Sequence, residues 1–437
     1  MNTILFGLLL IILAFLGSPL FSIIGAVALL AFAGANIDSS AVIVELYRLT
    51  SAPTLIAIPL FTFAGYILAE SNTPKRLVAL SQAFFGWIPG GLAVVALVSC
   101  AVFTAFTGAS GVTIVALGGL LYPILMSEKY TEKFALGLLT TSGSLGLLFP
   151  PSLPLILYGM IASNSRTVEG TLPDVSVDKL FVAGILPGIL LVVILSAYAI
   201  RQGSRAHVLK IPFAWKNVAK ALKDAMWEIP LPFLIIGGIY GGWFTATEAA
   251  AVTAFYVVVV EVFFYRDLKL FTDVPRIMQE SMILVGAIIV ILGCAMGLTN
   301  YLIDEEVPMK LFTWVQSFIT SKAAFLVLLN LFLIVVGMMM DIFSAIIVVV
   351  PLIVPIASAY DVNPVHLGII FLTNLEIGYL TPPVGLNLFI SSFRFEKPVT
   401  TVVKATLPYI GILLVALVII TYVPELSLWL VQALGIR

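Results

Sequence analysis

Two apolar segments of this chain are interrupted in the same way. The first is Ser142-Gly-Ser-Leu-Gly-Leu-Leu-Phe-Pro-Pro-Ser152, and the second is Asn374-Leu-Glu-Ile-Gly-Tyr-Leu-Thr-Pro-Pro-Val384. In each, a Gly is followed four residues later by Pro-Pro, which removes two backbone donors and frees carbonyl groups of the preceding turn. Freed backbone groups are very costly against lipid, so we expect them to be buried in protein or to bind a ligand.

The oxygens around these breaks suit a hard cation. In a low-dielectric interior Na⁺ needs about five or six oxygens in place of its water, and it prefers carbonyl, hydroxyl and carboxylate ligands. The candidate ligands near the first break are Thr107, Ser110, Gly143, Gly146 and Pro150, and those near the second break are Asp341, Ser344, Gly378 and Thr381.

Unpaired N–H groups in the same regions favour an anion. Half-helix N-termini and the tips of helical hairpins present such groups, together with the positive end of a helix dipole. We therefore expect one locus to hold Na⁺ and a carboxylate together, with the candidate substrate-binding residues Thr107, Gly108, Ser110, Asn374 and Asn387.

Each of these features also has a structural interpretation. A Pro-Pro can be a plain kink, and a Ser or Thr hydroxyl can bond to a carbonyl of its own helix. Asp341 lies in an apolar run, where an ionisable residue is functional by default, but it could instead cap a hairpin helix or belong to a buried pair. Glu376 could serve either role, and Glu248 is expected to cap a helix with Thr245 or Thr247.

The elements that position these residues are membrane helices. Hydrophobic residues make up 61% and charged residues 10% of the 437, and the mean hydropathy is +1.14, whereas a soluble domain carries roughly 25% charged residues. At about 20 residues per span, the sequence predicts an all-α polytopic membrane protein. The net charge of -1 gives no indication of nucleic-acid binding, and the isolated Cys and His residues argue against a disulfide framework or a metal centre built on them.

Two double-length apolar runs predict re-entrant hairpins whose tips stop inside the membrane. They cover 90–125 and 323–358, and they are interrupted at Thr107-Gly-Ala-Ser-Gly111 and at Met340-Asp-Ile-Phe-Ser344. Broken helices, 134–162 and 366–393, follow the hairpins. Further spans are expected at 3–16, 20–35, 54–69, 180–200, 229–243, 246–265, 278–299 and 405–423.

Basic residues set the expected orientation, because cytoplasmic loops carry an excess of Lys and Arg. With the N-terminus outside, alternating spans place 16 of the 22 basic residues in the cytoplasm. The linker 201–228, with six basic and two acidic residues, is then a cytoplasmic joint between the halves 1–200 and 229–437. An odd number of crossings precedes the linker, so we expect the second half to be inserted upside down and both termini to be periplasmic.

The two halves also share residues at a fixed offset. A shift of 232 residues superposes Pro150-Pro151 on Pro382-Pro383 and Gly146 on Gly378. Matched breaks in two inverted halves are typical of the central site of a secondary transporter. We expect two inverted-topology repeats, the first with a scaffold at 1–89, a hairpin at 90–125 and a broken helix at 134–162, the second with a hairpin at 323–358 and a broken helix at 366–393.

The order of hairpin and broken helix, given twice with opposite topology, resembles the ion-transporter superfamily. More narrowly, the whole chain resembles the large membrane subunit of tripartite ATP-independent periplasmic (TRAP) transporters. One departure is Phe106-Thr-Gly-Ala-Ser-Gly111, where the family commonly has Ser-Gly-Ser-Ser. The resemblance rests on Ile58-Pro-Leu-Phe-Thr-Phe-Ala-Gly65, Gly237-Gly-Ile-Tyr-Gly-Gly-Trp-Phe-Thr-Ala-Thr-Glu-Ala-Ala-Ala-Val252, Thr140-Thr-Ser-Gly-Ser-Leu-Gly146 and Thr381-Pro-Pro-Val-Gly-Leu-Asn-Leu-Phe389.

This resemblance implies Na⁺-coupled, elevator-type uptake of an organic acid across the bacterial inner membrane, and no enzymatic activity. It implies that a periplasmic binding protein delivers the substrate and that a small four-helix membrane subunit completes the transporter. Two alternatives stay open: a stand-alone Na⁺/dicarboxylate symporter of the same superfamily and an ion channel, which would conduct without saturation. The motifs do not distinguish C4-dicarboxylates from sialic acid or keto acids.

A cysteine introduced at position 215 tests the orientation. In a variant that lacks Cys100 and Cys294, we expect Trp215→Cys to be protected from a membrane-impermeant thiol reagent in intact cells and to react after permeabilisation. The reason is that the linker 201–228 faces the cytoplasm. Labelling in intact cells would reverse the assigned orientation.

Overall fold

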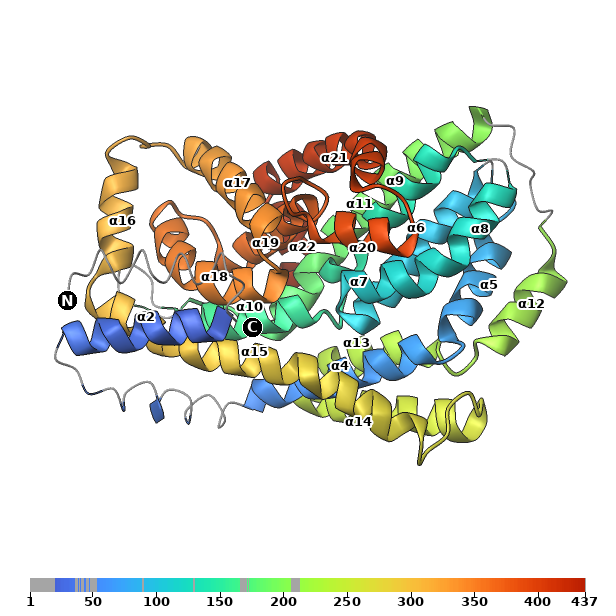
Figure 1. Ribbon diagram of the computed structural model, residues 1–437, viewed down its shortest axis with the longest axis horizontal. Coiled ribbons are helices and arrows are strands. Elements are labelled where there is room, and N and C mark those ends of the chain that lie inside the picture. Colours follow the sequence, from blue (N-terminus) through green and yellow to red (C-terminus); the bar gives the residue numbers. More distant parts are fainter. Residues whose placement is uncertain are drawn as a thin grey trace.

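The computed structural model describes residues 20–35 and 53–436, apart from 89, 129, 166–170, 172 and 206–212, together with a few single positions between 38 and 47. Within these residues the chain forms helices and no strand (Figure 1). Seven of the described helices are long and apolar enough to cross a membrane, and two bent helix pairs pass the same test. The all-α polytopic fold is therefore confirmed, while the expected span 3–16 lies outside the described residues.

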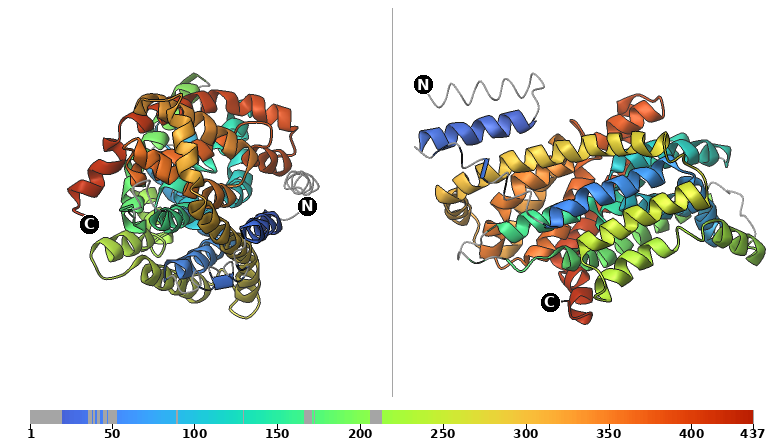
Figure 2. Two further views of the ribbon diagram at one scale, coloured as in Figure 1. Left: turned by 90° about the vertical axis from the view of Figure 1, so that its left-hand side faces the viewer. Right: turned by 90° about the horizontal axis from the view of Figure 1, so that it is seen from below.

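Long helices form a layer along the lower side of the molecule in Figure 1. Seen from below, α15 runs beside α2 and α4, and α14 packs on α4 (Figure 2). We call these helices the scaffold, and they include the expected spans 20–35, 54–69, 229–243, 246–265 and 278–299. Their bounds are α2 Leu20–Gly34, α4 Pro53–Glu70, α13 Pro230–Tyr240, α14 Ala246–Val259 with the π-helical turn η3 Val260–Phe264, and α15 Asp273–Asp304. As expected, Glu248 caps α14, and it forms a capping box with Thr245.

Each double-length run forms two helices joined within the expected interruption. In the first hairpin α6 (Gly91–Thr107) is followed by α7 (Ser110–Thr113), the π-helical turn η1 (Ile114–Gly118) and α8 (Gly119–Ser127). In the second hairpin α17 (Lys322–Met339) is followed by α18 (Ile342–Ala359). The helices of the second hairpin begin and end 232 residues after those of the first hairpin, to within one residue. The inverted relation of the two halves stays a prediction.

The two broken helices are interrupted where Gly and Pro-Pro occur. The first consists of α9 (Glu132–Ser142), the 3-10 turn η2 (Leu145–Leu148) and α10 (Leu153–Asn164), with a bend of 45°. The second consists of α19 (Pro364–Gly378) and α20 (Leu386–Arg394). Both Pro-Pro bonds are cis, and Ser152 caps α10 by accepting the Leu155 N–H.

Several helices complete the fold. The expected spans 180–200 and 405–423 lie in α11 (Val177–Arg205) and α21 (Val399–Tyr422), and α22 (Glu425–Ala433) follows α21. Four short helices were not expected, because their sequences are polar or brief: α5 (Thr73–Phe85), α12 (Trp215–Asp224), α16 (Val307–Gln316) and α22. The helix α12 lies in the basic linker, buries Val218 and Ala221 and packs on α5. The axes of α4 and α5 are bent by 75° relative to each other.

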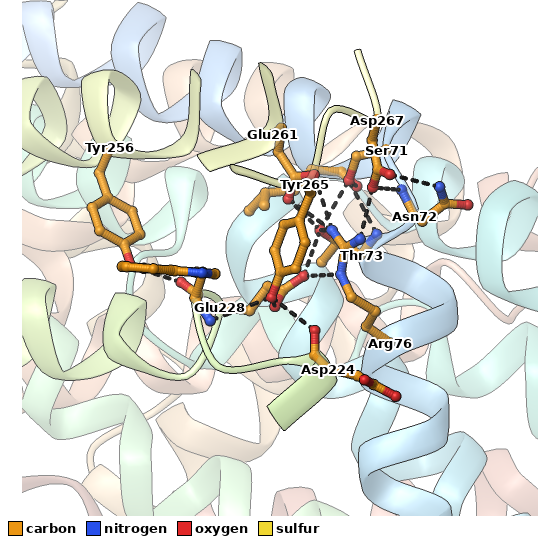
Figure 3. A network of polar contacts seen from close by, with 12 residues as sticks. Ser71, Asn72, Thr73, Arg76, Asp224, Glu228, Tyr256, Glu261, Tyr265 and Asp267 are labelled. Atoms are coloured by element: carbon orange, nitrogen blue, oxygen red, sulfur yellow. Dashed lines mark hydrogen bonds and ion pairs between the residues drawn. The ribbon is translucent and has the colours of Figure 1, made fainter. Parts of the chain in front are cut away.

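A cluster of charges fixes α5 to the scaffold (Figure 3). The Arg76 guanidinium forms ion pairs with Glu228, with Glu261 at 2.9 Å and with Asp267 at 2.7 Å. The Tyr265 ring lies 3.7 Å from the Arg76 Cζ, and its hydroxyl donates to Glu228 Oε2 at 2.7 Å. Burial acts to raise the pKa of Asp267, but hydrogen bonds from Asn72 and from Arg76 hold that pKa below its usual value. The Arg76 guanidinium thus joins α5 to Glu228, which precedes α13, and to Glu261 and Asp267, which follow α14.

We expect Arg76→Leu to destabilise the fold strongly. Removing one partner of a buried ion pair leaves uncompensated charge and costs about 3 to 5 kcal/mol, and here Glu261 is fully buried. The midpoint of thermal unfolding of the purified protein should fall clearly. Arg276→Leu is the matched control, because Arg276 pairs with Glu70 and Glu280 on the surface, where ion pairs contribute little. Equal losses in the two variants would contradict this role of the Arg76 cluster.

Candidate functional site

The tip of the first hairpin is a two-residue turn buried against α10. Gly108 ends α6 in the left-handed conformation at φ +65°, and its N–H donates to Thr104 O at 2.8 Å. A Cβ on Gly108 would lie 2.6 Å from a Leu153 methyl group, so a larger residue would not fit. The Thr107 side chain, directly before the turn, is fully buried, and its hydroxyl has no hydrogen-bond partner among the described residues.

Two threonines of this hairpin cover a carbonyl freed by the first break. The Thr104 and Thr113 hydroxyls lie 2.7 Å apart, and Thr104 donates to Gly143 O at 2.9 Å. All of these groups are buried. Sequence reasoning missed this pair, although Thr104 and Thr113 are equally far from the Gly108-Ala109 turn and so lie opposite each other in a hairpin.

Asn387 joins three of the expected site segments. Its Oδ1 accepts from the Ser110 hydroxyl at 2.8 Å, and its Nδ2 donates to Thr140 O at 3.4 Å. Its backbone N–H donates to Tyr379 O at 3.2 Å. Asn387 is fully buried, and it therefore connects the first hairpin tip, the helix α9 before the first break and the two sides of the second break.

The second hairpin tip is capped by Asp341. Its Oδ1 accepts the N–H groups of Phe343 and Ser344, both at 3.0 Å, and the Ser344 hydroxyl also donates to the carboxylate. The interpretation of Asp341 as a hairpin cap is therefore confirmed, and its role as a cation ligand stays a prediction. The tip is also tied to the second break, because the Ile342 N–H donates to the Tyr379 hydroxyl.

Close backbone contact joins each break to its own hairpin. A Cβ on Gly378 would lie 2.5 Å from the Gly337 backbone, and a Cβ on Gly146 would lie 2.5 Å from Ala105 N. The Gly385 N–H in the second break donates to Met338 O at 3.1 Å. These positions require glycine because backbone packs directly on backbone.

The remaining candidate residues differ in their surroundings. The hydroxyl of the candidate Thr381, like those of Ser142 and Ser144 in the first break, donates to a carbonyl of its own segment, as the structural interpretation of such residues expects. Asn374 donates to Asn330 Oδ1 at 2.7 Å and to Ile370 O, and no bond joins it to Ser110 or Asn387. Pro150 borders an apolar cavity of about 290 Å³ between α6, α11 and α13.

The two breaks differ in exposure. The first break is buried almost throughout, whereas Pro382, Pro383 and Val384 of the second break are exposed. A second cavity, of about 630 Å³, lies beside the first hairpin tip and is bounded by α4 and α20. Gly111 and Ile390 are among its lining residues, and these two residues pack against each other next to the Ser110 to Asn387 bond.

Comparison with known families shows which family the chain belongs to. The family model described as "Tripartite ATP-independent periplasmic transporter, DctM component" matches residues 6–426. The chain belongs to this family. It is thus a TRAP transporter large permease, a membrane transport subunit and not an enzyme.

Relatives with different named substrates align with most of the length of this large permease. The C4-dicarboxylate TRAP transporter large permease protein DctM of Pseudomonas aeruginosa is 36% identical over 417 residues, covering 94% of this chain and 93% of the relative. The ectoine/5-hydroxyectoine large permease protein UehC of Ruegeria pomeroyi is 32% identical and covers 86% of each chain.

A solved structure shares the fold of the large permease. The crystal structure of the YdaH transporter of Alcanivorax borkumensis superposes with a TM-score of 0.62. The superposition covers 90% of this chain and 88% of the other at 13% identity. This likeness concerns the fold alone.

We expect Gly378→Ala to disturb the second break. The added methyl group would meet the Gly337 backbone, and overpacking of this kind typically costs about 1 to 3 kcal/mol. The thermal midpoint of the purified protein should fall, and transport with it. Gly411→Ala in α21 is the control, because a Cβ there meets no atom within 4 Å. Unchanged stability of Gly378→Ala would show that α17 and α19 can separate without cost.

Proposed function

We propose that this large permease takes up an organic acid with Na⁺ as the coupling ion. The observation that carries the proposal is the connection of the two helix breaks and the first hairpin tip through Asn387. A ligand bound at this point would interact with both halves of the chain. The C4-dicarboxylate specificity named for several relatives supports a carboxylate substrate.

One Na⁺ site is proposed at the first tip and break. The Thr107 hydroxyl is buried there without a partner, and the Ser110 hydroxyl keeps its lone pairs free while it donates to Asn387. Carbonyl groups of Gly143, Gly146 and Pro150 would complete the oxygen ligands. A second site is proposed at Asp341, Ser344, Gly378 and Thr381, where the cap carboxylate supplies a negative charge.

The substrate is proposed to bind between these two ion sites. Ser110 and Asn387 would contact it directly, with Thr107 and Gly108 at the hairpin tip. Asn374 is held by Asn330, so its proposed contribution is to position α19.

The proposed transporter has further components. A periplasmic binding protein would deliver the substrate, and a small four-helix membrane subunit would assemble with the large permease in the bacterial inner membrane. Both termini would be periplasmic. The hairpins and broken helices would move as an elevator past the scaffold, and the absence of side-chain hydrogen bonds from α4 and α15 to these elements, within the described residues, supports that movement.

Thermal unfolding in Na⁺ tests ion binding without knowledge of the substrate. A ligand that binds only the folded state stabilises it by about 2.7 kcal/mol at about 100 times its dissociation constant. We expect NaCl to raise the unfolding midpoint of the purified protein above that in equal choline chloride. Thr107→Val and Asp341→Asn should each raise the Na⁺ concentration for half-maximal stabilisation about fivefold or more, because a lost ligand costs about 1 to 3 kcal/mol.

Two features make this test specific. Asn caps helices about as well as Asp, so Asp341→Asn should leave stability in choline unchanged. Thr373→Val is the control for Thr107→Val, because the fully buried Thr373 hydroxyl donates to Ile369 O in its own helix. Identical midpoints in Na⁺ and choline would contradict Na⁺ coupling. Succinate uptake by the purified large permease alone in liposomes would favour the stand-alone symporter.

A further inference from the structure

The short helix α12 in the basic linker presents an apolar face to the outside of the protein. Its buried residues Val218 and Ala221 mark the inward side of the helix. Trp215, Ala219 and Leu222 follow one another at intervals of four and three residues, so they share a different side. All three are exposed, Trp215 by 75% and Leu222 by 38%, so no other described element covers them. We call these three residues the apolar face.

Three lysines form a basic face beside the apolar face. Lys216, Lys220 and Lys223 each come one position after a residue of the apolar face, so the basic face is rotated from it by about 100° around the helix. All three lysines are exposed. The helix contains one acidic residue, Asp224, and in the described part of the chain every ion pair joins side chains outside α12. The basic face therefore has no partner among the described residues.

Aromatic side chains extend the apolar face beyond the helix. The ring of Phe213 lies 5.1 Å from that of Trp215 and 6.4 Å from that of Trp87, measured between ring centroids. Both Phe213 and Trp87 are exposed. Tryptophan is enriched where an apolar and an aqueous region meet, as they do at the surface of a bilayer.

The position of α12 in the fold agrees with such a surface. The axes of α4 and α5 are bent by 75° relative to each other, so α5 runs across the end of α4 and does not continue it through the membrane. The helix α12 packs on α5, at one end of the long axis of the molecule (Figure 1). With ten residues, α12 is also too short to span a bilayer. A short helix with an apolar and a basic face is typical of a helix that lies in the headgroup region.

We propose that α12, together with Trp87 and Phe213, is a binding surface for anionic phospholipids. The apolar face and the two aromatic rings enter the apolar edge of the headgroup layer, and the ammonium groups of the basic face pair with the lipid phosphates. Charge complementarity selects an anionic lipid, because a zwitterionic headgroup carries a positive charge of its own. The bound lipid holds α12, and with it the arm α5, at the membrane surface. This surface is independent of the proposed substrate and of Na⁺ coupling.

Quenching of Trp215 fluorescence by brominated lipid tests the proposal. The full-length protein is reconstituted in phosphatidylcholine bilayers that contain brominated phosphatidylglycerol or, in a parallel series, brominated phosphatidylcholine. The Trp215 signal is the difference between the protein and its Trp215→Phe variant, because the chain has six tryptophans. A lysine near an anionic surface strengthens binding about fivefold. We therefore expect half-maximal quenching at a mole fraction of phosphatidylglycerol that is lower by at least about tenfold than that of phosphatidylcholine.

Substitution of the basic face separates its charge from the apolar contact. We expect a triple Gln variant to lose the preference for phosphatidylglycerol while Trp215 is still quenched, because the apolar face remains. The triple Arg variant, which keeps the charge, should keep the preference. The Gln variant carries Lys216→Gln, Lys220→Gln and Lys223→Gln.

A matched control removes the same charge from exposed lysines elsewhere in the chain, and it should keep the preference. The control carries Lys133→Gln, Lys269→Gln and Lys404→Gln. Loss of the preference in the control would assign it to the net charge of the protein and contradict the role of α12. Equal quenching of the unsubstituted protein by the two lipids would overturn the proposal. Absence of any quenching of Trp215 would also overturn it, because the apolar face would then be open to water, as a docking surface for a soluble acidic protein would be.

Discussion

A helix broken inside a bilayer leaves backbone groups that no water can satisfy, and the structure depends on covering them. The hairpins provide the cover. Thr104 of the first hairpin donates to the freed carbonyl of Gly143, and Met338 of the second hairpin accepts the N–H of Gly385. This requirement explains why a hairpin precedes each broken helix and why glycine occurs where the two meet. Without the hairpin, the break would be too costly to form.

The two halves meet this requirement by different means. In the first half a pair of threonine hydroxyls covers the break, and the break is buried. In the second half backbone packs on backbone at Gly337 and Gly378, and an aspartate caps the hairpin. The prolines of the second break remain exposed. The two successions of hairpin and broken helix therefore differ in the chemistry of their breaks, which suits the proposed binding of unlike ligands at one locus.

The sequence predicts the features that depend on local chemistry. Gly and Pro-Pro located both breaks, and small or polar residues in apolar runs located both hairpin tips, because a helix end is decided by the residues that form it. The direction of a side chain depends on distant segments. The Asn374 amide donates to Asn330 Oδ1. Arg76 forms ion pairs with three acidic residues that lie more than 150 positions away in the sequence. The sequence left three roles open for Asp341, and the structure shows that it caps α18 by accepting the N–H groups of Phe343 and Ser344.

The contacts between the scaffold and the hairpins suit the proposed elevator movement. A surface that slides inside a membrane cannot exchange hydrogen bonds with water, so every polar bond across it would have to be broken at full cost. Among the described residues, α4 comes closest to the first hairpin at Gly65, where an added Cβ would lie 2.5 Å from Phe106 O. The strong polar bonds instead hold α5 at its angle to α4 through Arg76. The polar bonds therefore fix the arm α5 to the scaffold, and the described residues of α4 and α15 form no side-chain hydrogen bond to the hairpins. One bond joins the first hairpin to α5, because the Ser99 hydroxyl donates to Ser81 Oγ at 3.0 Å.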